Sequence, residues 1–335
     1  MNKSKLLIAL AAAGLSFSQT ASADAGGDNW SISGWINEAM IFYDDGAGSD
    51  IAQTSDNGTT LGSRITLAGS TDLGSSGLSA GFEVILEPQA GVGTGNPLTS
   101  SQTAVENTTN VGGFINELGY STYLSGNFGK VTLGLQSMPT DNIAVLADPS
   151  LTLWSNISPL FRGQAFAIRG LSGAGSKTTW GSFTSCLTMA TPIGLDCNGI
   201  YRNGIRYDLP AFGPVSVAVG YANDDIYDIA AKYNGDLAGM KAVLHLGYAI
   251  NQGSATIGTE SENFQVQGGL LDPGTGFFGL VAYQMEEADS AGANTGDDTD
   301  AWYTKVGIKK GFNSLGDTSI AFIYGSYNDQ WGAAD

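Results

Sequence analysis

Charged residues are scarce in this chain of 335 residues, and basic residues are the scarcest of them. Asp, Glu, Lys and Arg together make up 14% of the sequence, against about 25% in an average soluble protein. Only 14 basic residues stand against 32 acidic ones, which gives a formal net charge of −18. Because nucleic-acid binding rests on Lys and Arg that neutralise phosphates, this balance excludes a nucleic-acid-binding protein and favours attraction of cations.

Long apolar runs are missing as well, so no segment reaches the ~20 apolar residues of a transmembrane helix. The apolar segment from Leu6 to Phe17 is too short to span a bilayer; it follows two lysines and precedes an A-x-A site that ends at Ala23. This pattern is typical of a secretory signal, so we predict cleavage of residues 1–23 and a single mature domain at 24–335. Loss of the two lysines leaves 12 basic residues against 32 acidic ones, a net charge of −20.

Cysteine and histidine are nearly absent. Cys186 and Cys197 are the two cysteines, and in an exported chain we predict that they form one disulfide. A metal or redox pair would need neighbouring ligands or a C-x-x-C spacing. The single histidine, His245, has no G-x-S-x-G or similar nucleophile motif to serve, which argues against a hydrolase. It is predicted to be an indifferent wall residue; the alternative is that it tunes local charge.

Glycine and short turns are abundant instead. The sequence has 48 glycines, and six tight turns rich in Gly, Asp and Pro separate alternating stretches. The turns fall at 72–78, 126–130, 209–214, 234–239, 271–276 and 311–317. Long acidic loops lie between them. Short connections at one end and long ones at the other are typical of an up-and-down transmembrane β-barrel.

Apolar and polar residues alternate with period two, as in half-buried strands. Leu244 and Leu246 share one face of a strand, whereas His245 and Gly247 lie on the other. A lipid-embedded barrel needs apolar residues outside and polar residues inside. A soluble β-sandwich would alternate with its apolar face inward. Tyr and Trp near strand ends, and the alternation of long loops with short turns, favour the barrel.

Fifteen strands are predicted in this way. Their ranges are 30–43, 62–73, 78–88, 113–124, 129–137, 163–170, 177–184, 200–209, 214–223, 226–234, 239–250, 262–270, 276–287, 301–311 and 318–328. Bacterial single-chain barrels have an even number of strands. Either a final closing strand is absent from this chain, or one strand is miscounted.

Three stretches resemble one family. Residues 63–74 (SRITLAGSTDLG) with 78–87 (LSAGFEVILE) resemble the second and third strands of the general porins of Gram-negative outer membranes. Residues 120–134 (YSTYLSGNFGKVTLG) resemble the fourth and fifth, and 203–210 (NGIRYDLP) a later strand. The resemblance implies a sixteen-stranded, all-β antiparallel barrel, usually a homotrimer, that lies in the outer membrane among lipid and lipopolysaccharide.

In this family the third long loop folds into the lumen and sets the narrowest point. The resemblance places that constriction loop at about 137–161, with Asp141 and Asp148 in it, and matches Arg64 to a facing ladder of arginines. Alternation alone makes Arg202 and Arg206 lumen candidates. Arg162, at the loop's return, either lines the pore or anchors the loop by a salt bridge.

Two departures from the family pattern are visible. The family commonly has Gly-Arg-Gln where this chain has Gly134-Leu135-Gln136, so one arginine of the series on the pore wall is missing. The family's terminal aromatic residue has no counterpart at Asp335, which agrees with a missing last strand.

Acidic clusters occur in the predicted outward loops. They comprise Asp44-Asp45, Asp56, Glu260 with Glu262, Glu286-Glu287 with Asp289, and Asp297-Asp298 with Asp300. Oxygen ligands of this kind could bind Ca²⁺ and bridge lipopolysaccharide, but no EF-hand loop is present, and solvated acids are the favoured reading.

The sequence therefore predicts an outer-membrane general diffusion porin without cofactor or enzymatic activity. Small hydrophilic solutes and ions would cross its water-filled lumen passively, with a preference for cations. Two alternatives stay open: a substrate-selective channel on the same barrel, and a secreted β-rich adhesin or binding protein.

Overall fold

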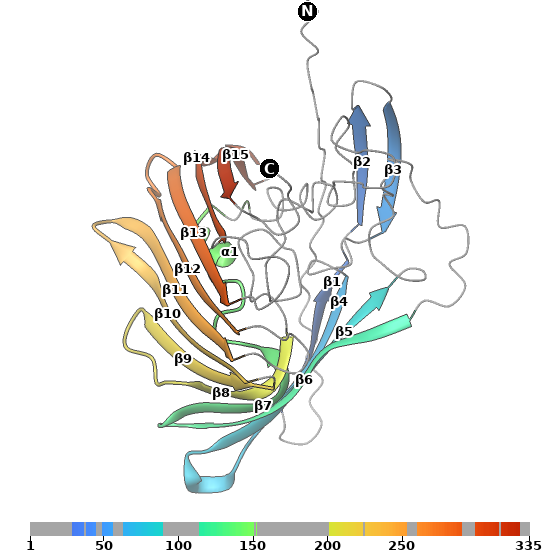
Figure 1. Ribbon diagram of the computed structural model, residues 1–335, viewed down its shortest axis with the longest axis vertical. Helices are drawn as coiled ribbons and strands as arrows, with labels where there is room; N and C mark the ends of the chain where they lie inside the picture. The colour runs from blue at the N-terminus through green and yellow to red at the C-terminus, as the bar shows by residue number, and fades with distance from the viewer. Residues whose placement is uncertain are drawn as a thin grey trace, which may run out of the picture. The chain divides into compact units, whose positions relative to one another are not determined.

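The computed structural model (Figure 1) describes eleven stretches of the chain, and all structural statements below concern these residues. They are residues 29–36, 38–44, 49–55, 63–89, 114–150, 152, 201–223, 225–252, 260–289, 299–314 and 316–328.

Within these stretches, fifteen β-strands are accompanied by one 3-10 helix and one short α-helix. The strands are β1 (Asn29–Trp35), β2 (Glu38–Asp44), β3 (Ser49–Ser55), β4 (Arg64–Asp72), β5 (Ser79–Gln89), β6 (Phe114–Gly126), β7 (Gly129–Ser137), β8 (Tyr201–Asp208), β9 (Val215–Ala222), β10 (Ile226–Leu237), β11 (Met240–Gln252), β12 (Glu260–Leu271), β13 (Phe277–Asp289), β14 (Thr299–Asn313) and β15 (Gly316–Asn328). The helices are η1 (Gly74–Ser76) and α1 (Ile143–Leu146).

From β4 to β15, strands of the main sheet that follow one another in the chain hydrogen-bond to each other, and β1 pairs with β4. The thirteen strands run in the order β1, β4, β5 and onward to β15, and β2 and β3 form a separate antiparallel hairpin. The contacts divide the chain into two units, of which the first contains β1–β3 and the second contains β7–β15 with α1. A meander of antiparallel strands confirms the predicted all-β, up-and-down architecture.

Tight turns set the register in the second unit. Leu237 pairs with Met240 at the end of the β10–β11 hairpin, which leaves a two-residue turn. The two turn residues, Ala238 and Gly239, have φ of 53° and 84°. A two-residue turn with both φ positive has the twist that matches two antiparallel strands, and glycine adopts it without strain. The hairpin therefore extends three residues beyond the predicted strand end at 234.

The polarity of this sheet is inverted relative to that of a soluble protein. Large apolar side chains of β11, β13 and β14 are exposed, with Leu244 at 42%, Val281 at 55% and Val306 at 54%. The opposite face carries buried polar side chains; among them are His245, Asn251, Asn263, Gln265, Gln267, Gln284, Glu286 and Lys305. An apolar face turned outward fits acyl chains rather than water, as in a transmembrane barrel and unlike a β-sandwich.

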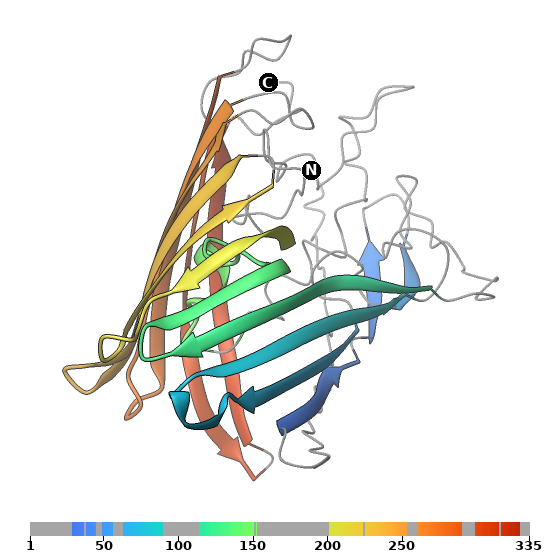
Figure 2. The ribbon, with the colours of Figure 1, turned by 90° about the horizontal axis from the view of Figure 1, so that it is seen from below.

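Figures 1 and 2 show how the second unit is built. Strands β8–β15 lie side by side and alternate in direction, and α1 lies on the concave side of the sheet from β7 to β15. We call the face that carries α1 the inner face and the opposite, apolar face the outer face.

The N-terminal region differs from the prediction. The single strand expected at 30–43 is two strands, β1 and β2, and β2 pairs with β3 in a hairpin. Residues 49–55 (SDIAQTS) had no strand signal, because this stretch lacks the apolar alternation from which a strand is inferred. The strands predicted at 163–170 and 177–184 lie outside the described residues.

Candidate functional site: the inner segment

The chain leaves β7 and runs along the inner face of the second unit. We call residues 138–150 and 152 the inner segment; it includes α1, which contacts β11, β12 and β13. Met138 packs with Ala222 and Ile226, and Ala144 packs with Ala282 and Ala301. Apolar side chains of β9, β10, β13 and β14 thus pack against the segment at two places.

The first polar contact lies at the start of the inner segment. Asp228 on β10 accepts hydrogen bonds from the backbone N–H of Thr140 at 2.9 Å and from its hydroxyl at 2.8 Å. Arg206 on β8 donates to the carbonyl oxygen of Ser137 at 3.0 Å, where β7 ends. Two wall residues therefore fix the exit of the segment from its strand.

The second contact lies at the C-terminal end of α1. Gln267 on β12 accepts a hydrogen bond from the Ala147 N–H at 2.9 Å. Its amide nitrogen donates to the Tyr303 hydroxyl at 2.6 Å, and that hydroxyl donates to the carbonyl oxygen of Ala144 at 3.5 Å. The Gln267 amide and the Tyr303 hydroxyl thus link the end of α1 to β12 and β14, and each pairs with one backbone group: the amide oxygen with the Ala147 N–H, and the hydroxyl with the Ala144 carbonyl.

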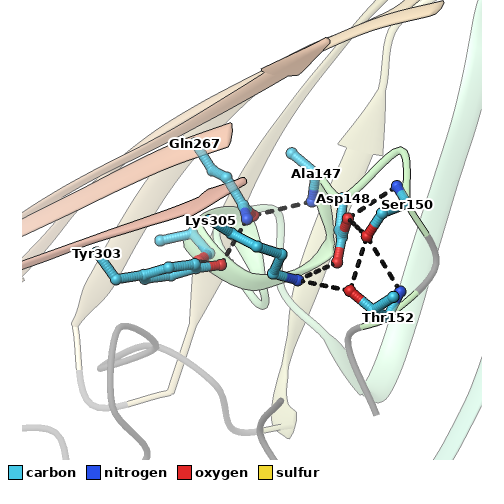
Figure 3. A network of polar contacts seen from close by, with 8 residues as sticks. Ala147, Asp148, Ser150, Thr152, Gln267, Tyr303 and Lys305 are labelled. Atoms are coloured by element: carbon cyan, nitrogen blue, oxygen red, sulfur yellow. Dashed lines mark hydrogen bonds and ion pairs between the residues drawn. The ribbon is translucent and has the colours of Figure 1, made fainter. Parts of the chain in front are cut away.

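The third contact is a buried ion pair (Figure 3). The Lys305 ammonium on β14 lies 2.5 Å from Asp148 Oδ2 and donates to the Thr152 hydroxyl at 3.1 Å. The other carboxylate oxygen of Asp148 accepts from the Ser150 N–H at 2.9 Å and from its hydroxyl at 2.6 Å. The two charged side chains are 2% and 3% exposed, so removing one partner leaves an uncompensated buried charge that costs about 3–5 kcal/mol.

The predicted constriction residues of this unit lie in or beside the inner segment. Asp148 forms the ion pair with Lys305, and Asp141 is buried, with one carboxylate oxygen accepting from the Asn142 side chain at 2.6 Å. Arg206 pairs with Asp208 at 2.7 Å two residues further along β8. Arg202 lies on the same strand and is half-buried.

Arg64 belongs to the first unit, where its guanidinium forms an ion pair with Glu87 at 2.8 Å. The same guanidinium lies over the Trp35 ring, 4.9 Å from the centroid, a cation–π geometry. A carboxylate partner for this arginine was not predicted.

Other predicted features are outside the described residues. Arg162, Cys186 and Cys197 fall there, so their roles and the disulfide stay predictions. In the part of the chain that the structure describes, no three His, Cys, Asp or Glu side chains are grouped to hold a metal ion. Among the same residues, no helix has the length and apolar character needed to cross a membrane.

Sequence analysis missed most wall partners of the inner segment. Lys305 alternates with Val306 in the strand predicted at 301–311, but nothing in the sequence indicates its pairing with Asp148, 157 residues away. Gln267 and Asp228 had no signal beyond their polar character, because pairing across a barrel depends on register, which a single sequence does not reveal.

Comparison with known proteins identifies the class. The sequence profile of the Gram-negative porins matches residues 7–335, so the chain belongs to this family. No curated protein sequence matches significantly. An anion-selective porin from Comamonas acidovorans superposes with a TM-score of 0.55 and 20% identity, covering 90% of this chain and 80% of that one.

Two further solved structures are similar at lower TM-scores. OmpT of Vibrio cholerae gives 0.46 with 13% identity, covering 91% of this chain and 89% of that one. OmpF of Salmonella typhi, solved with daunomycin, gives 0.40 with 11% identity, covering 91% of this chain and all of that one. Of the three, the Comamonas porin alone exceeds 0.5, and the assignment of a porin β-barrel fold rests on it.

Membership of this family establishes the general function of the protein. The protein is a porin, a channel-forming β-barrel of the Gram-negative outer membrane. The predictions of family, fold class and location are confirmed, and the alternative of a secreted adhesin is set aside. Anion selectivity is a property of the Comamonas porin, and a likeness at 20% identity shows only that this chain shares its fold.

Proposed function

We propose that this porin is a general diffusion channel for small hydrophilic solutes and ions, without enzymatic activity. The inverted polarity of the sheet carries the proposal: exposed apolar side chains on the outer face suit lipid, and polar side chains on the inner face suit a wet lumen. Such a wall lets hydrated solutes bypass a hydrocarbon barrier of about 30 Å.

The loop at 137–161 is proposed to narrow this channel. Its described part is the inner segment, which is held on the inner face by residues of β8, β10, β12 and β14. A segment fixed by several hydrogen bonds and an ion pair makes a stable constriction, because its displacement requires several buried contacts to break together.

Cation preference is proposed from the pairing of the basic residues. Arg64, Arg206 and Lys305 each lie within 2.8 Å of a carboxylate oxygen, so their charges are compensated locally. The chain as a whole carries a net charge of −18. With these three basic side chains neutralised and an acidic surplus in the chain as a whole, the potential along the pore favours cations.

Planar bilayer recording tests the channel and its selectivity separately. We expect stepwise conductance increments from the purified protein, and under a KCl gradient a reversal potential of the sign for K⁺ preference. A potential of the opposite sign would overturn the cation preference and leave the channel intact. An absence of steps, together with liposomes that do not swell in small sugars, would overturn the channel itself.

Passage of one preferred solute is the rival proposal for the same barrel. The amides of the inner face argue against it, since Gln265 and Gln267 are fully buried and already hydrogen-bonded to Gln284 and Tyr303. They offer no polar surface to a solute. Saturable, solute-specific current block would decide for the rival.

We further propose a homotrimer, as the family resemblance implies; native mass spectrometry from detergent tests it.

A further inference from the structure

Three glycines of the inner face lie directly beneath the inner segment. A Cβ built on Gly247 of β11 would lie 2.9 Å from Ile143 Cγ1 and 3.2 Å from Thr140 Cγ2. On Gly220 of β9 it would lie nearest to Asp228 Oδ1 and 2.5 Å from Met138 Cε, and on Gly269 of β12 it would lie 2.9 Å from both Leu280 Cβ and Pro149 Cδ. Real Cβ atoms essentially never lie within 3.0 Å of another side chain, so a larger residue at any of these three positions forces a neighbour to shift.

Each glycine lies near a polar anchor along the segment. Met138, which lies over Gly220, comes two residues before Thr140, which hydrogen-bonds to Asp228. Ile143, which lies over Gly247, comes one helical turn before Ala147, whose N–H donates to Gln267. Contact with Gly269 through Pro149 adjoins the ion pair of Asp148 with Lys305. The wall therefore lacks side chains where the segment approaches most closely and supplies polar groups where it is held.

We propose that Gly220, Gly247 and Gly269 recess the inner segment into the wall, that Lys305 is its main positioning residue, and that these residues thereby set the pore conductance. The proposal rests on the constriction role proposed above. A missing Cβ lets the backbone lie about 1.5 Å closer to the strands, and that distance is added to the free width of the lumen. Conductance is sensitive to such a change at the narrowest point.

The glycine part is tested by adding volume at Gly247, whose three nearest atoms all belong to the inner segment. Gly247→Ala and Gly247→Val should push the segment toward the lumen and lower single-channel conductance in that order, the latter by about twofold. Ile143→Ala removes the atom that the new side chain meets. In the Gly247→Val background it should restore most of the lost conductance.

The matched control is Gly279→Ala on β13. A Cβ there would lie 3.8 Å from the Lys305 carbonyl oxygen and 3.9 Å from Val306 Cγ1, which are ordinary contacts, and none is with the inner segment. Its conductance should equal that of the wild type.

Lys305 is tested by Lys305→Met and Asp148→Asn, alone and combined. Each single variant leaves one buried group without its charge partner, so we expect lower mean conductance and several-fold higher open-channel noise. The combined variant leaves neither charge, and its noise should fall below that of either single variant. Lys241→Met is the control, since Lys241 on β11 forms an exposed ion pair with Asp236 on β10, beside the turn.

The outcomes separate this proposal from the function on which it rests. If the wild type forms no channels, the proposed function fails first. If the wild type conducts, and Gly247→Val and Lys305→Met conduct like it with unchanged noise, the positioning proposal is overturned. Far-UV circular dichroism in detergent checks folding. Should Gly247→Val fail to fold, the single methyl of Gly247→Ala decides by the same criterion.

Discussion

Asp228 on β10 holds Thr140 of the inner segment by two hydrogen bonds, one to its backbone N–H at 2.9 Å and one to its hydroxyl at 2.8 Å. Both residues are buried, with exposed fractions of 6% and 1%. A single carboxylate oxygen accepts both bonds, so backbone and side chain of one loop residue are fixed by one atom of the wall.

Loss of the Thr140 hydroxyl should weaken this contact without removing it. We expect Thr140→Val to lower the free energy of unfolding by about 1–3 kcal/mol, since a buried bond to a charged group is lost. Urea unfolding in detergent micelles measures the effect. Thr122→Val is the control, because its hydroxyl bonds an exposed carbonyl, that of Gly81, at 3.0 Å. Equal losses in both variants would contradict a special role for the buried contact.

The outer face should reject charge in a depth-dependent way. Leu246 is the middle residue of β11 and is 38% exposed, whereas Leu237 ends β10 at a turn and is 56% exposed. Leu246→Arg should cost about 2–4 kcal/mol and Leu237→Arg about 0–1 kcal/mol, because the penalty is largest at the bilayer midplane. Guanidinium unfolding from lipid vesicles measures both. A larger penalty at Leu237 would contradict the membrane placement of this face.

Neutralising Glu87 should shift ion selectivity. Its carboxylate lies 2.8 Å from the Arg64 guanidinium, so Glu87→Gln removes a negative charge from beside that positive one. We expect the ratio of cation to anion permeability to fall about twofold, read from the reversal potential under a KCl gradient. Asp236→Asn removes an equal charge from an exposed turn and should leave the ratio unchanged. An unchanged ratio in Glu87→Gln would place this pair away from the ion path.

The turn between β12 and β13 should respond to acid. The Asp272 carboxylate accepts hydrogen bonds from the Thr275 hydroxyl at 2.6 Å and the Gly274 N–H at 2.9 Å, and these bonds hold the pKa of Asp272 below its ordinary value. Because the folded pKa lies below the unfolded one, the bonds stabilise the turn above the unfolded pKa of about 3.9. This contribution is lost as the pH falls through the folded pKa.

Wild type and Asp272→Ala should therefore differ most at neutral pH. We expect their difference in unfolding free energy to stay constant down to about pH 5 and to shrink below about pH 4. Denaturant titrations over this range measure it. The control is Asp236→Ala, whose carboxylate pairs with Lys241 instead. A difference that grows in acid would contradict the assigned hydrogen bonds.

The strands of the second unit were predictable because each alternates apolar and polar residues, a pattern that is visible in the sequence alone. In β11, alternation assigned Leu244 and Leu246 to the apolar face, and the structure exposes both. The turn at 234–239 was marked by its Gly and Asp, although β10 continues to Leu237. The β2–β3 hairpin escaped prediction, since its second strand is uniformly polar apart from Ile51 and Ala52.

The anchors of the inner segment could not be predicted in the same way. The contact between Lys305 and Asp148 depends on the strand register, on the length of the inner segment and on the glycines beneath that segment. No local sequence pattern around either residue reveals any of these. The resemblance to porins indicated that a loop would enter the lumen, and it pointed to Asp148. It said nothing of the lysine that receives this carboxylate.

Pairing between consecutive strands has a practical consequence for engineering. From β7 to β15 every hydrogen-bond ladder joins neighbours in the chain, so lengthening a connection alters no partner. A peptide epitope spliced between β11 and β12 would leave both ladders of each strand in register. This connection is therefore a suitable insertion point for foreign sequences that must leave the sheet intact.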